Sequence, residues 1–459
     1  MCMAKIVSID PSNNKEIGST TITTEKEIIT LVQKSKKAQL GWGALSVKER
    51  IKHIKSMFDV FKANEDKLVN LISKEMGKGV TSARGSLDFY FENLQWYIDN
   101  AERCLQDEIL NETKSEISKI VFEPKGVVAS IIPWNYPFGM FVWQGCQNLI
   151  AGNTVIMKPS EFTSLTGKLI ADLIEKSSLP KDVFITIYGD GKVGEILVNQ
   201  DIDLICFTGS TAVGQLLYKK AAEKFIPALM ELGGSAAGIV FDDVDVDHIV
   251  DSIYENRFLN NGQSCDALKR LLVHESKFDI VVEKLKKLVT GKVVGKPSDT
   301  KTDIGPLVSK RHFELVASQV DDAINKGAKV ICGGKKLNLD NGNYYEPTIL
   351  TNIKKDMRVW NEEVFGPVLP IMPFKTFEQA IELANDTRYG LGGYIFTSNK
   401  NTFEKASRLL KTGGLCQNNL SYVQPQNPFG GTKMSGLGRN NGKHGFQELC
   451  NLKVITCEK

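Results

Sequence analysis

The sequence lacks three features that would narrow its class at once: paired cysteine motifs, a strong charge imbalance and a membrane-type apolar run. Its nine cysteines are scattered, without CxxC pairs or zinc-like spacing to the five histidines, so we expect a reducing compartment and no metal. Lys plus Arg number 57 and Asp plus Glu 54, an excess of +3 that does not indicate nucleic acid or an anionic membrane as the main partner. The N-terminus has no signal-peptide pattern, so we expect a cytoplasmic protein.

One segment, residues 126–157, contains no charged residue at all. Polar amides and prolines interrupt it, namely Pro133, Asn135, Pro137, Gln144, Gln147, Asn148 and Asn153. Amides at this density are unfavourable in lipid. We therefore interpret the segment as a buried strand, a turn and a helix beside a site, and we expect no membrane association.

The 459 residues allow two or three domains, and 42% apolar with 24% charged residues is typical of a soluble globule. Helical spacing dominates residues 24–110, and strands alternate with helices from 126 to 240 and again from about 250 to 430. This alternation predicts an α/β protein with mainly parallel sheets, whose ligands bind beyond the carboxyl ends of the strands. Two further strands, Glu108–Phe122 and the C-terminal NLKVITCEK, are predicted to pair with each other or with another subunit.

Three residues have the chemistry of a nucleophile, a base and an oxyanion donor. Cys265 follows Gly262 at a turn, where a thiol can be activated, although a free cysteine is more often a small core residue. Glu231 ends an apolar strand, where burial would raise its pKa toward that of a general base; otherwise it is a solvated carboxylate. Asn135 lies in the turn PWNYP and has an amide donor suited to an oxyanion, or is simply a good turn residue.

A second group of residues is suited to a nucleotide. The segment FTGSTAVG runs from a strand into a helix, whose N-terminus could hold a pyrophosphate, although the motif is not GxGxxG. Lys158 and Glu161 follow another strand and could hold a ribose, or be ordinary loop charges.

Seven motifs in order along the chain make the combination specific: PWNYPF, IMKPSE, FTGSTAVG, MELGGS, NNGQSC, EEVFGPV and PFGGTKMSGLGR. Together they resemble the aldehyde dehydrogenase superfamily over nearly the whole chain, most closely its short bacterial and archaeal succinate-semialdehyde dehydrogenase-like members. The resemblance implies an aldehyde dehydrogenase-like α/β fold. It comprises a Rossmann-like cofactor domain (1–107 and 125–233), an α/β catalytic domain (234–433) and a small β oligomerisation element (108–124 and 434–459). It also implies a homodimer or homotetramer.

The resemblance further implies the role of each site residue. Cys265 is the nucleophile, Glu231 the base, and Asn135 with the Cys265 backbone N–H forms the oxyanion hole. The cofactor, NAD with NADP possible, is assigned to Trp134, Lys158, Glu161, Gly209, Ser210, Gly214, Glu363 and Phe365. The reaction is oxidation of an aldehyde to its carboxylic acid through a thiohemiacetal and a thioester on the cysteine.

The substrate pocket is assigned to Tyr136, Met140, Trp143 and Leu259, which favour a neutral or apolar aldehyde. Relatives that take succinate semialdehyde usually carry arginines where Trp143 and Leu259 stand. Arg257 lies two residues out of that register, and Asp266 beside the thiol would repel an anion. Three alternatives stay open: a succinate-semialdehyde dehydrogenase, a coenzyme A-acylating enzyme, which commonly lacks the glutamate of ELGG, and a catalytically silent homologue.

Overall fold

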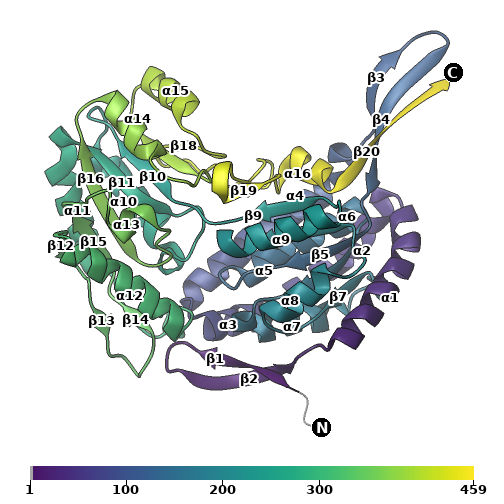
Figure 1. Cartoon of the computed structure of the whole chain (residues 1–459), viewed down its shortest axis with the longest axis horizontal. Helices are drawn as coiled ribbons and strands as arrows, with labels where there is room; N and C mark the ends of the chain where they lie inside the picture. The colour runs from purple at the N-terminus through teal and green to yellow at the C-terminus, as the bar shows by residue number, and fades with distance from the viewer. Residues whose placement is uncertain (1–3) are drawn as a thin grey trace.

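The computed structural model describes residues 4–459, and Figure 1 shows two large sheets flanked by helices and a small sheet that projects from one end. None of the helices in this described part is both long and apolar enough to span a membrane. The predicted α/β class is confirmed.

The first large sheet is built from the predicted strand–helix alternation. In spatial order its strands are β19 (Gly436–Leu437), β9 (Ala228–Glu231), β8 (Leu204–Thr208), β5 (Val127–Ile131), β6 (Thr154–Lys158) and β7 (Phe184–Thr186). All pairs are parallel except β19 with β9. Every residue of β5, β6 and β8 is buried, as expected for strands covered by helices on both faces. The order reverses at β5, where the chain goes first to β6 and later to β8.

Helices cover both faces of this sheet. One face packs against α1 (Glu25–Ala44), α8 (Gly191–Val198) and α9 (Thr211–Glu223). The other packs against α2 (Val47–Lys62), α4 (Val80–Cys104), α6 (Gln147–Ala151), α7 (Ser164–Ile174), α16 (Gly442–Glu448) and a π-helical turn, η1 (Phe141–Cys146). Capping boxes set the start of α1, through Thr24 and Glu27, and of α2, through Ser46 and Glu49.

The second large sheet has the spatial order β12 (Lys329–Cys332), β15 (Thr348–Thr351), β16 (Val368–Phe374), β11 (Leu268–His274), β10 (Ala236–Val240), β17 (Gly393–Phe396) and β18 (Cys416–Gln417). Only β12 is antiparallel to its neighbour. One core contains residues of α12 (Lys310–Asn325), α13 (Arg358–Asn361), α14 (Phe377–Asn385) and α15 (Lys400–Leu409). The opposite core contains residues of α10 (Val246–Phe258) and α11 (Phe278–Thr290).

The small sheet confirms the predicted pairing of the bridge with the C-terminus. Its order is β20 (Cys450–Glu458), β4 (Glu116–Pro124) and β3 (Glu108–Glu112), all antiparallel. Figure 1 shows this sheet extending away from both large sheets. Part of the stretch 434–459 does not belong to it, because β19 pairs with β9 and α16 packs against α4. The division into three domains stays a prediction.

The remaining elements are short or peripheral, apart from one helix that packs against α4. They are the hairpin β1 (Lys5–Asp10) with β2 (Lys15–Thr21), the pair β13 (Lys336–Leu337) with β14 (Tyr344–Tyr345), α3 (Glu65–Met76), α5 (Pro137–Met140) and the 3-10 turns η2 (Glu161–Thr163), η3 (Leu259–Gly262), η4 (Glu275–Lys277) and η5 (Lys433–Ser435). Of these, α5 directly follows the turn that contains Asn135, and η3 lies in the loop that leads to Cys265.

Candidate functional site

The predicted cofactor residues gather at one edge of the first sheet. Trp134 follows β5, Lys158 ends β6, and Gly209 follows β8. Because these strands are parallel, their carboxyl ends share that edge, and β5 marks the point where the strand order reverses. Such a reversal opens the crevice in which ligands of open α/β sheets bind.

The start of α9 is suited to a pyrophosphate. Ser210 caps the helix by accepting a 3.4 Å hydrogen bond from the Val213 backbone N–H. The first N–H groups of a helix have no intrahelical partner and attract anions. A Cβ on Gly214 would overlap the Leu232 side chain, so glycine allows α9 to lie close against the strand that carries Glu231. These features fit a dinucleotide.

Lys158 and Glu161 lie near each other at the carboxyl end of β6. The Lys158 ammonium is buried and donates to the carbonyls of Pro159 (2.9 Å) and Gly189 (2.8 Å). Burial lowers the pKa of Lys158, and the charge of Glu161 partly opposes this effect. Glu161 itself is half-buried, so its carboxylate is accessible to hydroxyl donors.

The loop before Cys265 has an unusual backbone. Asn260, Asn261 and Gly262 have successive φ values of 54°, 57° and 69°, in the left-handed region. Such strain persists only where the surroundings fix it. Here the Asn261 amide donates to the carbonyls of Gly305 (2.7 Å) and Pro306 (2.9 Å), and a Cβ on Gly262 would overlap the Gly366 carbonyl. The loop presents Cys265 half-buried, just ahead of β11.

Asn135 is tied directly to this loop. Its Nδ2 donates to the Gln263 carbonyl (3.1 Å), and Nδ2 of Asn260 donates to the carbonyls of Asn135 and Gln263, both at 3.1 Å. Because an amide nitrogen carries two hydrogens, Asn135 keeps a second donor. The predicted oxyanion donor is therefore held beside the predicted nucleophile.

Glu231 ends β9 and is only 3% exposed. Its Oε1 accepts a 3.3 Å hydrogen bond from Nδ2 of Asn440, while its Oε2 has no partner among the described residues. Burial raises its pKa well above the usual value, and Arg439 and Asn440 counteract this only in part. Three residues further on, a Cβ on Gly234 would overlap the Cys265 carbonyl oxygen. The segment that follows Glu231 therefore lies directly against Cys265.

The surroundings of Cys265 raise the pKa of its thiol and so favour the thiol over the thiolate. Burial raises its pKa well above the usual value, and the carboxylates of Asp266, Glu363 and Glu231 raise it further. Lys269 opposes them: its ammonium donates to the Ser264 carbonyl (2.6 Å) and lies 3.5 Å from Glu363 Oε1. The environment therefore differs from the activated thiol that the sequence suggested, and the thiol must lose a proton before it can attack.

Glu363 and Phe365, which precede β16 of the second sheet, contact residues that follow strands of the first sheet. Glu363 Oε1 accepts from the Gly234 backbone N–H (3.0 Å). The Phe365 ring packs edge-on against Trp134, with ring centroids 5.5 Å apart, and its carbonyl accepts from Nε2 of His312 (2.6 Å). Burial lowers the pKa of His312 to about 4, so this imidazole is neutral.

The predicted pocket residues differ in exposure. Met140 and Trp143 are buried, and Nε1 of Trp143 donates to Asn93 Oδ1 (3.2 Å). Tyr136 is half-buried, whereas Leu259 is 54% exposed. Leu259 begins the turn η3 at the surface, so it offers less apolar burial than the sequence suggested.

Arg257 does not supply a cation for a substrate. It is fully buried, and its guanidinium donates to the carbonyls of Val368 (2.6 Å), Val364 (3.2 Å) and Gly366. Burial lowers its pKa to about 9. The side chain therefore holds the backbone of the 364–368 segment in place.

Sequence reasoning missed three residues that contact the predicted site: Lys269, His312 and Asn440. Asn440 is 209 positions from Glu231, and His312 is 53 positions from Phe365. Lys269 offered one signal, because it stands, with Arg270, as a charged residue in a mostly buried strand, four positions after Cys265.

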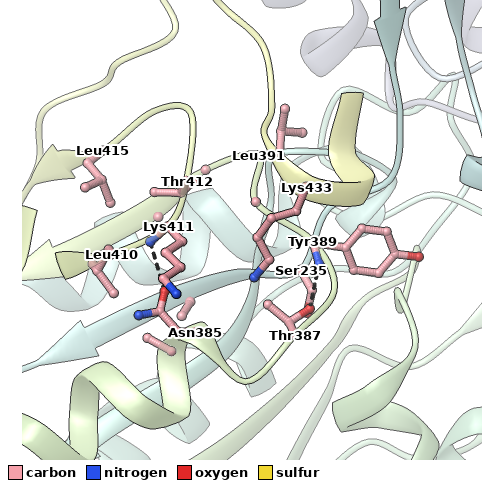
Figure 2. Close-up of a pocket in the computed structure, with 15 residues that line it drawn as sticks. Ser235, Asn385, Thr387, Tyr389, Leu391, Leu410, Lys411, Thr412, Leu415 and Lys433 are labelled. Carbon is pink, nitrogen blue, oxygen red and sulfur yellow. Dashed lines mark hydrogen bonds between the residues drawn. The ribbon is translucent and has the colours of Figure 1, made fainter. Parts of the chain in front are cut away.

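A separate pocket lies on the second sheet and contains none of the predicted site residues. Figure 2 shows Lys433 pointing into it from η5, with Ser235, Thr387 and Tyr389 nearby. Dashed lines mark the bonds from the Tyr389 backbone N–H to Thr387 (3.2 Å) and from the Lys411 backbone N–H to Asn385 (2.9 Å).

Comparison with known proteins gives consistent results. Residues 2–455 match the model of the aldehyde dehydrogenase family. Glutarate-semialdehyde dehydrogenase of Pseudomonas aeruginosa is 33% identical over 97% of this chain and 92% of its own length. Betaine aldehyde dehydrogenase of Bacillus subtilis is 36% identical over 97% and 93%. The crystal structure of betaine aldehyde dehydrogenase from Staphylococcus aureus with NAD+ superposes with a TM-score of 0.94, at 32% identity, over 99% of this chain and 91% of that one.

Proposed function

Because this chain belongs to the aldehyde dehydrogenase family and is an NAD(P)-dependent enzyme of that family, we propose that Cys265, Asn135 and Glu231 carry its chemistry. The observation that supports this most is their convergence. Asn135 is bonded to the loop that presents Cys265, and the segment that follows Glu231 abuts the Cys265 carbonyl.

In the first step, the Cys265 thiol releases its proton to solvent, Sγ adds to the aldehyde carbon, and the carbonyl electron pair moves onto oxygen. The free N–H of Asn135 and the backbone N–H of Cys265 stabilise this oxyanion. The bound NAD(P) supplies the acceptor for the hydride that leaves this carbon. The result is a thioester on Cys265.

In the second step, Glu231 removes a proton from a water molecule, which adds to the thioester carbon. The carbon–sulfur bond breaks, the carboxylic acid leaves, and the proton held by Glu231 passes to the departing sulfur, which restores both the Cys265 thiol and the Glu231 carboxylate. The buried Oε2 of Glu231, which has no protein partner, is suited to hold that water.

For the substrate, we propose an aldehyde without a negatively charged tail. The relatives include enzymes for aldehydes with and without a negatively charged tail, as the names glutarate-semialdehyde dehydrogenase and betaine aldehyde dehydrogenase indicate. In this chain, Trp143 and Leu259 cannot pair with a carboxylate, and Arg257 is bonded to backbone carbonyls. A succinate-semialdehyde dehydrogenase is therefore less well supported.

We expect neutral aldehydes to exceed succinate semialdehyde in kcat/KM by at least about tenfold, because an unpaired buried carboxylate costs well over 1.4 kcal/mol. The measurement is an initial-rate panel with propanal, hexanal, benzaldehyde and succinate semialdehyde, each with NAD and NADP. A clear preference for succinate semialdehyde would show that a cation elsewhere serves the tail.

We also expect NAD to be preferred over NADP. The Glu161 carboxylate can accept hydrogen bonds from both ribose hydroxyls, whereas a 2′-phosphate would meet a like charge there, with Lys158 already donating to two carbonyls. Glu161→Gln should lower the ratio of kcat/KM with NAD to kcat/KM with NADP by up to about tenfold, because one negative charge is removed. Glu175→Gln, an exposed carboxylate at the end of α7, is the matched control. An unchanged ratio in Glu161→Gln would exclude Glu161 from the ribose site.

A further inference from the structure

Lys269 lies in β11, and its side chain is only 2% exposed. The register of β11 against β10 shifts at this residue. Consecutive residues of β10 pair with Leu268 and with Arg270, so Lys269 is left out of this pairing. Such an irregularity allows a strand to direct one side chain away from the regular alternation, and it is frequent next to active sites. The strand is therefore irregular at a position from which an ammonium reaches the loop of Cys265.

The Lys269 ammonium contacts both the loop of the nucleophile and the segment that precedes β16. It donates to the Ser264 carbonyl at 2.6 Å, lies 3.5 Å from Oε1 of Glu363 and lies 4.5 Å from the centroid of the Phe365 ring. Glu363 Oε1 also accepts from the Gly234 backbone N–H at 3.0 Å, on the segment that follows β9. One buried cation therefore connects the segments proposed to carry the nucleophile, the base and part of the cofactor site.

The other charges close to the Cys265 thiol are negative. Burial raises the pKa of this thiol, and three carboxylates raise it further, namely those of Asp266, Glu363 and Glu231. The charge of Lys269 acts in the opposite direction. The thiolate, and not the thiol, is the nucleophile in covalent catalysis by cysteine. A cation beside Cys265 therefore increases the share of the reactive form.

Lys269 is itself mostly charged at neutral pH. Burial lowers its pKa to about 8 and the charge of Arg257, on α10, contributes to this, whereas Glu363, Cys265 and Asp266 oppose it. At pH 7 about nine tenths of a group with this pKa is protonated. The cation is therefore present in the pH range in which the thiol must lose its proton.

The remaining ionisable groups that face Cys265 or Lys269 are neutral in this range. Burial lowers the pKa of His312, on α12, to about 4, and the charge of Lys269 contributes to this. Burial also raises the pKa of the tyrosines close to the thiol, which are Tyr90, Tyr136, Tyr394 and Tyr422. A change in the pH profile of the thiol that follows a change at Lys269 is therefore not caused by the titration of these groups.

We propose that Lys269 is a positioning residue for the first step of the reaction: its ammonium holds Glu363 beside the Cys265 loop and supplies the positive charge that stabilises the thiolate. This inference rests on the proposed function. Charges interact more strongly in a poorly hydrated site than in water. Without the ammonium, the Glu363 carboxylate would also remain beside the thiol as an unpaired negative charge. Loss of Lys269 therefore disfavours the thiolate in two ways.

The test follows the pH profile of Cys265 alkylation by iodoacetamide, a neutral reagent whose approach does not depend on the charge of Lys269. Mass spectrometry of the peptide that contains Cys265 measures the rate without requiring turnover. Lys269→Met keeps a long side chain and removes the charge. We expect alkylation at pH 7 to be at least about tenfold slower in this variant, and its profile to lie at least about one pH unit higher, because one unit is tenfold in thiolate.

Two further variants separate charge from structure. Lys269→Arg keeps a positive charge and should restore most of the rate. The double variant that combines Lys269→Met with Glu363→Gln removes both members of the ion pair, so its profile should return toward that of the wild type. Removing the opposite charge would not repair a purely structural defect. Lys375→Met, at an exposed lysine that follows β16, is the matched control and should leave the profile unchanged.

Turnover provides a second readout. The pre-steady-state burst of reduced cofactor begins with addition of the thiolate, so Lys269→Met should slow the burst at pH 7 by about tenfold. The burst should recover as the pH rises, because a higher pH replaces the missing stabilisation of the thiolate. This pattern differs from the one expected for a variant of the base, in which the burst survives and the steady state is slow.

The outcomes distinguish this inference from the proposed function. An unchanged pH profile of Cys265 alkylation in Lys269→Met would overturn the role of Lys269 and leave the proposed function intact. Slower alkylation that neither Lys269→Arg nor the double variant reverses would also overturn it, in favour of a structural role. Turnover that survives in Cys265→Ala would instead refute the proposed function, whatever the alkylation profile shows.

Discussion

Replacing Cys265 with alanine is expected to lower aldehyde oxidation at least about a thousandfold, because a nucleophile that forms the covalent intermediate has no substitute. The change removes one sulfur from a half-buried side chain. The loop itself is held by the bonds of Asn260 and Asn261, which do not involve the thiol. Steady-state formation of reduced cofactor measures the loss.

Two controls accompany this variant. Cofactor binding, followed by quenching of tryptophan fluorescence, should be retained, because the residues proposed for the ribose and the pyrophosphate lie at the edge of the first sheet. Cys457→Ala, at an exposed cysteine of β20, should keep its activity. Turnover that survives in Cys265→Ala would refute the covalent mechanism.

Replacing Glu231 with glutamine should separate the two halves of the reaction. In the proposed mechanism, hydride departure requires Cys265 and Asn135, whereas thioester hydrolysis requires a base. We expect a pre-steady-state burst of reduced cofactor to survive, followed by a steady state slowed by about a hundredfold or more, the usual contribution of a positioned base. Rapid mixing with acid quench would detect the accumulated acyl-enzyme.

The pH dependence of turnover provides a second test of the role of Glu231. Burial raises the pKa of Glu231, so the carboxylate form needed as a base is lost as the pH falls through that raised value and is regained as it rises. Wild-type turnover should therefore increase as the pH rises through that raised pKa. Glu231→Gln should lack the part of this rise that comes from hydrolysis. If the burst itself disappears in a folded variant, Glu231 acts before hydride transfer, for example by accepting the thiol proton.

The sequence alone determined the family, the fold class and the candidate chemical groups. Motifs such as MELGGS and IMKPSE end apolar strands, and the carboxyl ends of parallel strands meet at one edge of a sheet. A local pattern therefore indicated that residues such as Glu231 and Lys158 share one edge. The pairing of β4 with β20 was also predictable, because neither strand is stable alone.

Only the tertiary structure decided which partners surround these groups. Asn440 reaches Glu231 across 209 positions, and the Trp143 ring packs against both Tyr90 and Phe429. Arg257 lies only two residues before Leu259 in the sequence, yet its guanidinium donates hydrogen bonds to the carbonyls of Val364 and Val368. A side chain's protonation, exposure and availability depend on segments that pack against it from elsewhere in the chain. The sequence near Cys265 therefore predicted a nucleophile, but the pKa of its thiol and the charge of its pocket follow from the fold.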